Sequence, residues 1–315
     1  MAGTAFSKSL RMLALGAVAV ALTILPPVLP EYIVILLSQT MVYAMAATSL
    51  DILIGYTNLG SLGHASYFAI GAFATAILET KYKAGFAVSL FSSIGIAAGA
   101  SALIGLLALR TSGIYFLLIT LSMAMSIWGL IYQWQSFTGG DNGISEIPRP
   151  NLKPWLDLSN HVHFYYFILI FFAISLMLVI LLIRSPFGKT LVGIRDSEPR
   201  MKVLGYNVWV HKYLAFIIAG AFAGLAGSVY AYFNKFVGPG DAGLDQCMEF
   251  VLMVSIGGPG TLIGANIGAL LITFMKNMVS VYTNRYLFIL GLVYVLTAKY
   301  APDGIMGLIK KLGRR

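Results

Sequence analysis

The short sequence Gly188-Lys189-Thr190 is the motif in this chain whose residue types come closest to binding a nucleotide phosphate. In a phosphate-binding loop, the lysine contacts phosphate oxygens and the hydroxyl that follows it contacts magnesium. Such a loop also requires a glycine five residues before the glycine of the Gly-Lys pair. Here Ile183 occupies that position, at the end of an apolar segment and not of a strand. We therefore predict that the chain does not hydrolyse ATP, is not an enzyme and has no catalytic residues.

The histidines and the cysteine do not have the spacing of a metal site. Cys247 is the single cysteine, which excludes an internal disulfide and a cysteine-rich metal centre. His161 and His163 lie beside a polar loop, where a solvated pair is a simpler interpretation than a metal contact. His64 and His211 stand alone. The sequence therefore predicts no bound metal.

A few polar side chains interrupt the apolar segments, and such groups at membrane depth are candidates for function. Asp51 lies near the end of one segment, where it either lines a path or sits at the membrane interface. Asn58, Ser61 and His64 flank a glycine-rich break, and they either line a translocation path or satisfy backbone groups that the break frees. Glu249 begins a later segment, and it either serves the path or caps a helix.

The composition indicates that these residues lie on helices that cross a lipid bilayer. Hydrophobic residues make up 58% of the 315 residues, and charged residues make up 10%, against roughly 25% in soluble domains. A bilayer can cover that much apolar surface, whereas a soluble core of this size cannot. We predict a single integral membrane domain over 1–315, all-α and polytopic, with about 8–10 transmembrane helices.

Hydropathy divides the chain into nine apolar segments. We interpret the first as a retained span and not as a cleaved signal peptide, because its apolar stretch continues past the cleavage-like Ala17-Val18-Ala19. The predicted segments are Leu10–Leu29, Tyr32–Ile54, Ala65–Leu78, Phe86–Leu109, Ile114–Tyr132, Phe164–Ile183, Tyr213–Phe233, Met248–Val279 and Tyr286–Ala298.

The number of crossings conflicts with the distribution of basic residues. The positive-inside rule places both termini and the loop 184–212 in the cytoplasm, whereas nine crossings would place the C-terminus outside. The conflict disappears if Met248–Val279 breaks at Gly257-Gly258-Pro259-Gly260 and then either turns back or crosses twice. Irregular backbone at this depth requires surrounding protein or a water-filled path. We therefore predict that Gly257 and Gly258 belong to a translocation path or a subunit interface.

The break over 55–64 in the first half and the break over 257–260 in the second half indicate an internal structural repeat with a transport path between its halves. Small residues at four-residue spacing also predict close helix packing or dimerisation. These residues are Gly95 and Gly99, Gly220 and Gly224, and Gly260, Gly264 and Gly268.

The loop 184–212 contains six of the 21 lysines and arginines. Within it, the residues from Arg195 to Gly205 predict one short helix. Ser197 can cap this helix, Pro199 fits its first turn, and Gly205 can adopt the left-handed conformation that ends it. Because two spans can be joined without a helix, the pattern favours either a partner that binds the helix or a helix resting on the lipid surface.

Several sequence stretches, taken in this order and spacing, resemble the LivM-type permease subunit of branched-chain amino acid ABC importers. The resemblance extends from about residue 40 to residue 308. Tyr206 and Ala265 depart from the residues that are frequent in the family, which leaves the substrate and the fine packing open but not the family membership. The matching stretches are Gly55-Tyr56-Thr57, Ser61-Leu62-Gly63-His64-Ala65, Ile70-Gly71-Ala72, Thr138-Gly139-Gly140, Asn142-Gly143, Arg184-Ser185-Pro186-Phe187-Gly188, Leu204-Gly205, Asn207, Leu214-Ala215-Phe216, Ala223-Gly224-Leu225-Ala226-Gly227, Gly257-Gly258, Gly260-Thr261, Gly264, Pro302 and Gly304.

The resemblance implies a permease in the bacterial inner membrane that pairs with a second, homologous permease subunit. It also implies two cytoplasmic ATPase subunits, which use ATP and magnesium, and an extracytoplasmic substrate-binding protein. This chain would bind no cofactor itself and no nucleic acid. The short helix of the loop would then be the coupling helix that contacts the ATPase. Its expected coupling residues are Ser197, Glu198, Arg200, Met201, Leu204 and Gly205.

Other functions remain open at this stage. A permease for urea or short amides, or for simple sugars, would share the architecture. An ion-coupled secondary transporter would also contain repeats and broken helices, but it usually needs more buried charged groups than this chain offers. An intramembrane enzyme would need clustered ionisable residues, which the sequence does not show.

Overall fold

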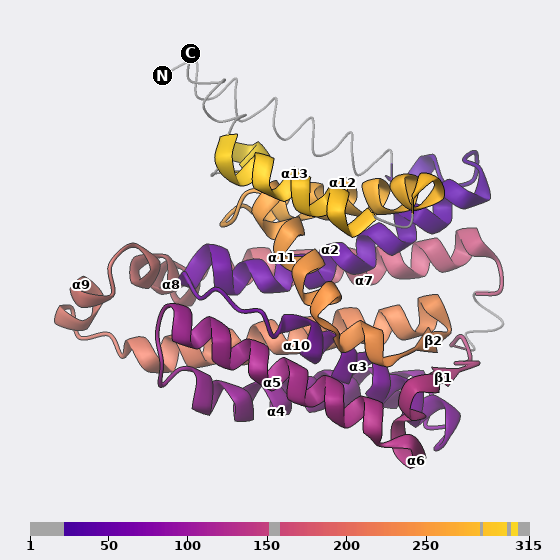
Figure 1. The fold of residues 1–315 in the computed structure, drawn as a ribbon, viewed down its shortest axis with the longest axis horizontal. Coiled ribbons are helices and arrows are strands. Elements are labelled where there is room, and N and C mark those ends of the chain that lie inside the picture. Colours follow the sequence, from indigo (N-terminus) through magenta and orange to yellow (C-terminus); the bar gives the residue numbers. More distant parts are fainter. Residues whose placement is uncertain (1–21, 151–157, 284–285, 301–303, 308–315) are drawn as a thin grey trace.

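The computed structural model describes residues 22–150, 158–283, 286–300 and 304–307 (Figure 1). Most of the predicted first span and the basic cluster at the C-terminus lie outside the described residues. The rest is built almost entirely of helices, which confirms the prediction of an all-α polytopic membrane protein. Six of the described helices are long and apolar enough to cross a membrane: α2 (Glu31–Thr57), α4 (Phe86–Ala108), α5 (Ile114–Gln133), α7 (His161–Arg184), α10 (Val208–Asn234) and α12 (Leu262–Tyr282).

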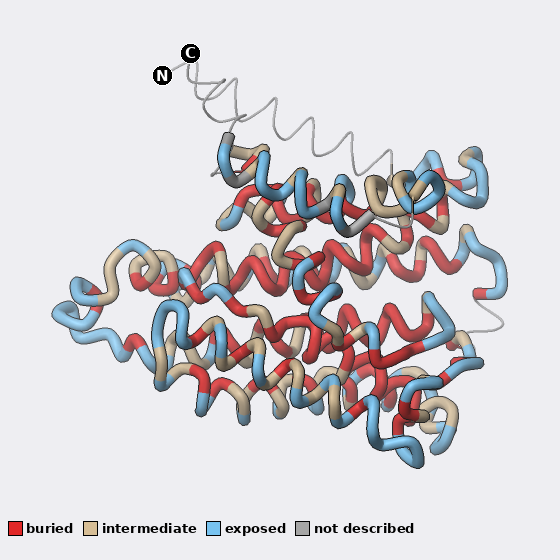
Figure 2. The backbone as a smooth tube through the Cα atoms, in the orientation of Figure 1, coloured by how far each residue is buried: buried red, intermediate tan, exposed pale blue. Residues whose placement is uncertain are grey.

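Helices α2 and α10 form the centre of the bundle, because most of their residues are buried (Figure 2). Small residues let the neighbouring helix α3 (His64–Thr80) approach α10 closely. A Cβ atom on Gly71 would lie 2.3 Å from the carbonyl oxygen of Gly224, and one on Gly227 would lie 1.9 Å from that of Phe68. The predicted close packing at Gly224 is therefore confirmed. It is not found at Gly95 and Gly99, where an added Cβ would meet no neighbouring atom of the described residues within 4 Å.

In the outer helices α4, α5 and α7, only about a quarter of the residues in the most apolar stretch are buried. Their exposed side chains are large and apolar, as in Phe91, Leu103 and Met177. Without a bilayer or a partner, these faces would leave apolar surface in water, which is unfavourable. The helices therefore have the distribution expected of lipid-facing spans around a buried pair.

Two long helices are each followed by an irregular loop and a shorter helix. Helix α2 ends at Asn58, a left-handed residue, and the loop 58–63 leads into α3. Helix α10 ends at Lys235, also left-handed, and the loop 235–243 leads into α11 (Leu244–Gly257). The two long helices run in opposite directions (Figure 1). The loop 235–243 therefore follows α10 as the loop 58–63 follows α2, and the predicted correspondence of 257–260 with 55–64 stays a prediction.

The loop 257–260 instead joins two helices that pack against each other. A Cβ on Gly257 would lie 1.9 Å from the carbonyl oxygen of Gly264, and one on Gly268 would lie 1.8 Å from that of Met253. These pairs run in opposite order along α11 and α12, so the two helices form an antiparallel hairpin. The predicted reversal at Gly257-Gly258-Pro259-Gly260 is confirmed. Helix α13 (Tyr286–Tyr300) follows and contacts both.

At the end of the bundle opposite the loop 184–212, short elements connect the two halves. Strand β1 (Ile144–Ser145) pairs antiparallel with β2 (Phe236–Val237). Helix α6 (Gln135–Thr138) and the 3-10 helix η1 (Gly140–Asn142) precede β1. The ammonium of Lys81 donates to the carbonyl oxygens of Ser136 and Phe137, at 2.8 and 2.9 Å. These contacts therefore connect the end of α3 and the loop 235–243 to the segment that follows α5.

Candidate functional site

The loop 184–212 folds into two helices that project from one end of the bundle (Figure 1). Helix α8 (Pro186–Asp196) begins after Ser185, whose hydroxyl accepts a hydrogen bond from the backbone N–H of Gly188. Helix α9 (Glu198–Val203) begins after Ser197. The sequence predicted one helix from Arg195 onward. That prediction was wrong at its start, because Arg195 belongs to α8 and the chain is extended at Ser197.

The predicted caps of α9 are present. The Ser197 hydroxyl accepts from the backbone N–H of Arg200 at 3.4 Å, and Pro199 lies in the first turn. Gly205 follows the helix with φ of +87°, a conformation that costs a residue with a Cβ about 1–2 kcal/mol. The local sequence therefore determines where α9 begins and where the chain turns away from it.

Three of the predicted coupling residues differ in how they are held. Met201 is buried in a small cluster with Ile194 and Val208, so it holds α9 against its neighbours. Met201 was expected among the coupling residues as an apolar contact with the ATPase, and its burial contradicts an exposed contact there. Glu198 forms an ion pair with Lys212 of α10, which orients its carboxylate. Leu204 is exposed, as a partner contact requires.

The outward surface of α9 is mixed apolar and basic. We call this surface the α9 face, which consists of Arg200, Lys202, Val203, Leu204 and Tyr206. Val203 is 89% exposed and Leu204 is 64% exposed, although both are apolar. Apolar residues that are flanked by basic ones on a projecting, capped helix favour a protein contact or a lipid surface.

Two of the three predicted path residues of the first break, Ser61 and His64, lie inside the fold. The hydroxyl of Ser61 is buried and accepts from the backbone N–H of Gly63 at 3.3 Å. The Nε2 atom of His64 lies 2.7 Å from the hydroxyl of Ser49, while its Nδ1 atom has no hydrogen-bond partner among the described residues. Asn58 is exposed and supplies the left-handed residue that ends α2. Ser61 thus satisfies backbone at the break, and Asn58 shapes it.

The glycines of the second predicted break are packed against backbone. Gly257 contacts α12, as described above, and Gly258 has φ of +111°. A Cβ on Gly304 would lie 2.4 Å from the Cα atom of Gly258. Both glycines are buried, and their surroundings explain why side chains are excluded there. These contacts show close packing within the chain, and a role of the two glycines in a translocation path or a subunit interface stays a prediction.

The first break and the 257–260 turn meet at a point that sequence reasoning did not foresee. A Cβ on Gly55 would lie 2.0 Å from the backbone nitrogen of Gly260. Asp51, which is fully buried, accepts a hydrogen bond from that same nitrogen at 2.8 Å. Arg195 of α8 donates to the carbonyl oxygen of Gly55, also at 2.8 Å. Asp51 therefore holds the turn after α11 against α2, which neither interpretation of its role included, and an acid one helical turn before Gly55 was the available signal.

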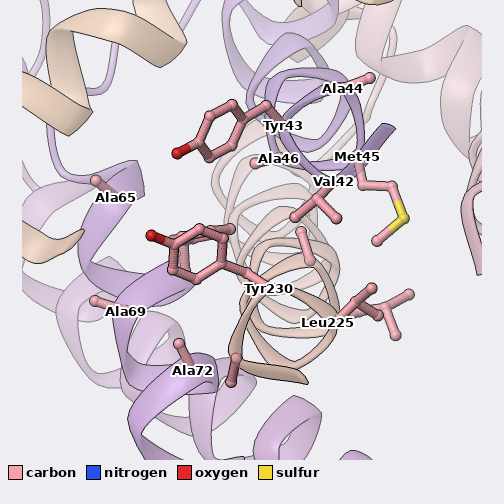
Figure 3. Close-up of a cluster of buried hydrophobic side chains, with 14 of the residues drawn as sticks. Val42, Tyr43, Ala44, Met45, Ala46, Ala65, Ala69, Ala72, Leu225 and Tyr230 are labelled. Carbon is pink, nitrogen blue, oxygen red and sulfur yellow. The ribbon is translucent and has the colours of Figure 1, made fainter. Parts of the chain in front are cut away.

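A second polar cluster lies between α2, α10, α11 and α12. Glu249 is in the middle of α11, so it does not cap that helix, and it forms an ion pair of 2.6 Å with Lys276 of α12. The hydroxyl of Tyr230 donates to Asp241, which lies in the 3-10 helix η2 (Pro239–Ala242), at 2.9 Å. The ring of Tyr230 stacks on that of Tyr43, and the two hydroxyls point to the same side (Figure 3). This cluster holds the α11–α12 hairpin against the two central helices.

No group of three or more histidine, cysteine, aspartate or glutamate side chains that could hold a metal occurs among the residues that the structure describes. Cys247 is buried and free. The chemistry of the site is therefore that of helix contacts, hydrogen bonds and ion pairs.

A bundle with six described helices long and apolar enough to cross a membrane, and with an ordered helix pair at one end, is the fold of a multi-pass membrane protein. A sequence profile of the family described as "Branched-chain amino acid transport system / permease component" matches residues 32–298. The chain belongs to this family of permease components.

Curated relatives carry names that agree with this assignment. The high-affinity branched-chain amino acid transport system permease proteins LivM of Salmonella typhimurium and Escherichia coli are each 28% identical over 326 residues. Each alignment covers 96% of this chain and 76% of the relative. A probable branched-chain amino acid transport permease protein LivM of Methanocaldococcus jannaschii is 25% identical over 114 residues, which cover 36% of this chain and 33% of the relative. No solved structure matches the chain.

Proposed function

We propose that this chain is a transmembrane permease subunit of an ABC importer that moves branched-chain amino acids across the bacterial inner membrane. The observation that carries the proposal is the capped helix α9, whose apolar and basic face projects from the bundle of a branched-chain amino acid permease family member. A projecting helix that is fixed by Ser197, Met201 and the Glu198–Lys212 pair can pass a displacement of its partner on to the bundle, whereas a flexible linker cannot.

The proposed partners follow from what the chain lacks. It has no complete phosphate-binding loop, so ATP and magnesium are used by two separate ATPase subunits that dock on the α9 face. The proposed complex also contains a second, homologous permease subunit and an extracytoplasmic binding protein that delivers the substrate. The proposed orientation has both termini and the α9 face in the cytoplasm, as the basic loop residues favour.

The polar cluster at Glu249 and Lys276 bears on the choice between transport mechanisms. Ion-coupled transporters use buried ionisable groups along their pathways. In this chain, the Glu249 carboxylate of α11 is paired with Lys276 of α12, so it links the two helices of the hairpin. We therefore place ATP-driven transport ahead of coupling to an ion gradient.

Uptake into proteoliposomes tests the proposal. The complex of this chain with its ATPase and permease partners is reconstituted, and uptake of radiolabelled leucine is measured with the binding protein outside and ATP on the side of the ATPases. The expected result is uptake that requires ATP and persists when ion gradients are collapsed. Excess unlabelled isoleucine and valine should compete, while urea, acetamide and ribose should not.

Two results would contradict the proposal in different ways. Uptake by this chain alone, driven by a proton or sodium gradient without ATP, would indicate a secondary transporter. ATP-driven uptake with competition by urea or by a sugar, but not by leucine, would retain the ABC importer and replace its substrate.

A further inference from the structure

Arg195 connects the last turn of α8 to the end of the membrane-embedded helix α2. Its Nη1 atom donates to the carbonyl oxygen of Gly55 at 2.8 Å, across 140 positions of sequence. Its Nε and Nη2 atoms both lie 3.1 Å from a carboxylate oxygen of the adjacent Asp196. The guanidinium therefore contacts Asp196, at the start of the α8–α9 junction, and also contacts the end of α2.

Asp51 connects the same stretch of α2 to the turn between α11 and α12. Its Oδ1 atom accepts from the backbone N–H of Gly260 at 2.8 Å. The carboxylate is fully buried, so the hydrogen bond is not weakened by competing water. Asp51 lies one helical turn before Gly55, which places both contacts on one face of α2.

The packing at this point leaves little freedom for one element to move without the others. A Cβ on Gly260 would lie 2.9 Å from the carbonyl oxygen of Gly55 and 3.0 Å from Nη1 of Arg195. On its other side, the turn is covered by Gly304, which packs on Gly258. The turn is thus enclosed by α2, by Arg195 and by the segment after α13. Asn58, which begins the loop 58–63, follows Gly55 by less than one turn.

We propose that Arg195 and Asp51 are positioning residues that form a latch, through which displacement of α8 and α9 moves both the end of α2 and the 257–260 turn. The proposal rests on the proposed function, because a coupled movement requires that an ATPase displaces α9. The latch does not depend on which residues the ATPase contacts. The latch lies between the α9 face and the rest of the bundle. It determines how much of the movement of α9 reaches the end of α2 and the 257–260 turn.

The chain offers matched substitutions for a test. Arg195→Gln removes the cation that reaches Gly55, and Arg195→Lys keeps a cation that can still donate to that carbonyl. Lys189→Gln removes a positive charge from the exposed surface of the same helix, where the side chain makes no contact with the latch. Asp51→Asn keeps the Oδ1 acceptor for Gly260, whereas Asp51→Leu removes the acceptor at similar volume.

Each variant is assayed in the complete reconstituted complex, and three quantities are measured: copurification of the ATPase subunits, ATP hydrolysis, and leucine uptake per ATP hydrolysed. Loss of a hydrogen bond from a charged group corresponds to roughly a tenfold change in an equilibrium, so uptake per ATP should fall about tenfold in Arg195→Gln and Asp51→Leu. Copurification and hydrolysis should remain within about twofold of wild type. Arg195→Lys and Asp51→Asn should recover most of the coupling, and Lys189→Gln should behave as wild type.

Hydrogen exchange of the purified chain provides a readout that does not depend on transport. Asp51→Leu should speed exchange of the Gly260 amide by about tenfold, while Asp51→Asn leaves it protected. Arg195→Gln should leave exchange within α12 unchanged, which shows that the fold is intact.

The outcomes separate the latch from the proposed function. If the wild-type complex shows no ATP-dependent uptake, the proposed function fails. If the wild type couples normally and Arg195→Gln couples equally well, the latch is overturned. Loss of ATPase copurification in Arg195→Gln would also overturn it, because Arg195 would then belong to the docking surface and not to the link behind it.

Discussion

Replacing Gly257 with alanine places a methyl group between α11 and α12 where the two backbones are in close contact. The new Cβ would lie 1.9 Å from the carbonyl oxygen of Gly264. Since Cβ atoms in proteins essentially never approach other atoms within 3.0 Å, the two helices must separate by about 1 Å. Forcing one extra carbon into a packed interior costs about 1–3 kcal/mol. We expect the free energy of unfolding to fall by that amount.

The assay is thermal unfolding of the detergent-purified chain, followed by uptake in the reconstituted complex. Gly95→Ala is the matched control, because a Cβ at Gly95 of α4 would meet no neighbouring atom within 4 Å in the part of the chain that the structure describes. This control removes a flexible glycine from a helix and should stabilise the chain by about 0.5–1 kcal/mol. Gly257→Ala should unfold at a lower temperature than wild type and transport more slowly. If both variants unfold at or above the wild-type temperature, the close packing at Gly257 does not constrain the hairpin.

Three further predictions concern the helix pair and the polar cluster. Met201→Ala should cost about 2 kcal/mol by leaving a cavity under α9, and hydrogen exchange over 198–203 should accelerate. Unchanged exchange there would show that α9 is held by other contacts. Gly205→Val should cost about 1–2 kcal/mol at its left-handed backbone and weaken copurification of the ATPase, while Gly205→Asn should be tolerated better. Lys276→Met should cost about 3–5 kcal/mol by removing the ion-pair partner of Glu249, and adding Glu249→Gln should recover most of the loss in thermal unfolding. A double variant as unstable as the single one would contradict the pairing.

Much of the fold was predictable from the sequence, because hydropathy determines where apolar helices begin and end. Tyr286–Ala298 was predicted, and α13 covers Tyr286–Tyr300. The reversal at 257–260 was also predictable, since three glycines and a proline cannot continue a helix. The caps of α9 followed from residue type, because serine and glycine have strong positional preferences at helix ends.

The contacts between distant segments were not predictable from local patterns. The hydrogen bond from Gly260 to Asp51 spans 209 positions, and the one from Arg195 to Gly55 spans 140. Both depend on how α2, α8 and the hairpin pack in three dimensions. The burial of Met201 was missed for a related reason, since a short helix gives too few residues to identify its buried face.

Glycine content was the signal that paired the break over 55–64 with the break over 257–260, and it gave no reason to consider the loop 235–243. The loop 257–260 is richer in glycine, but the loop 235–243 follows a long central helix and leads into a short one, as 58–63 does. This likeness in the order of elements was visible only once the helix α11 was separated from α12.

Site-specific photocrosslinking at α9 tests the central claim most directly, which is that the ATPase acts on this helix. A photoreactive amino acid replaces Val203, which is 89% exposed on the α9 face, and a second variant carries it at Tyr82, which is 67% exposed near the opposite end of the bundle. In membranes that contain the whole complex, we predict a crosslink from position 203 to an ATPase subunit, with a yield that changes when ATP is added, and none from position 82. Crosslinks from position 203 to lipid alone, in a complex that still transports, would contradict the account.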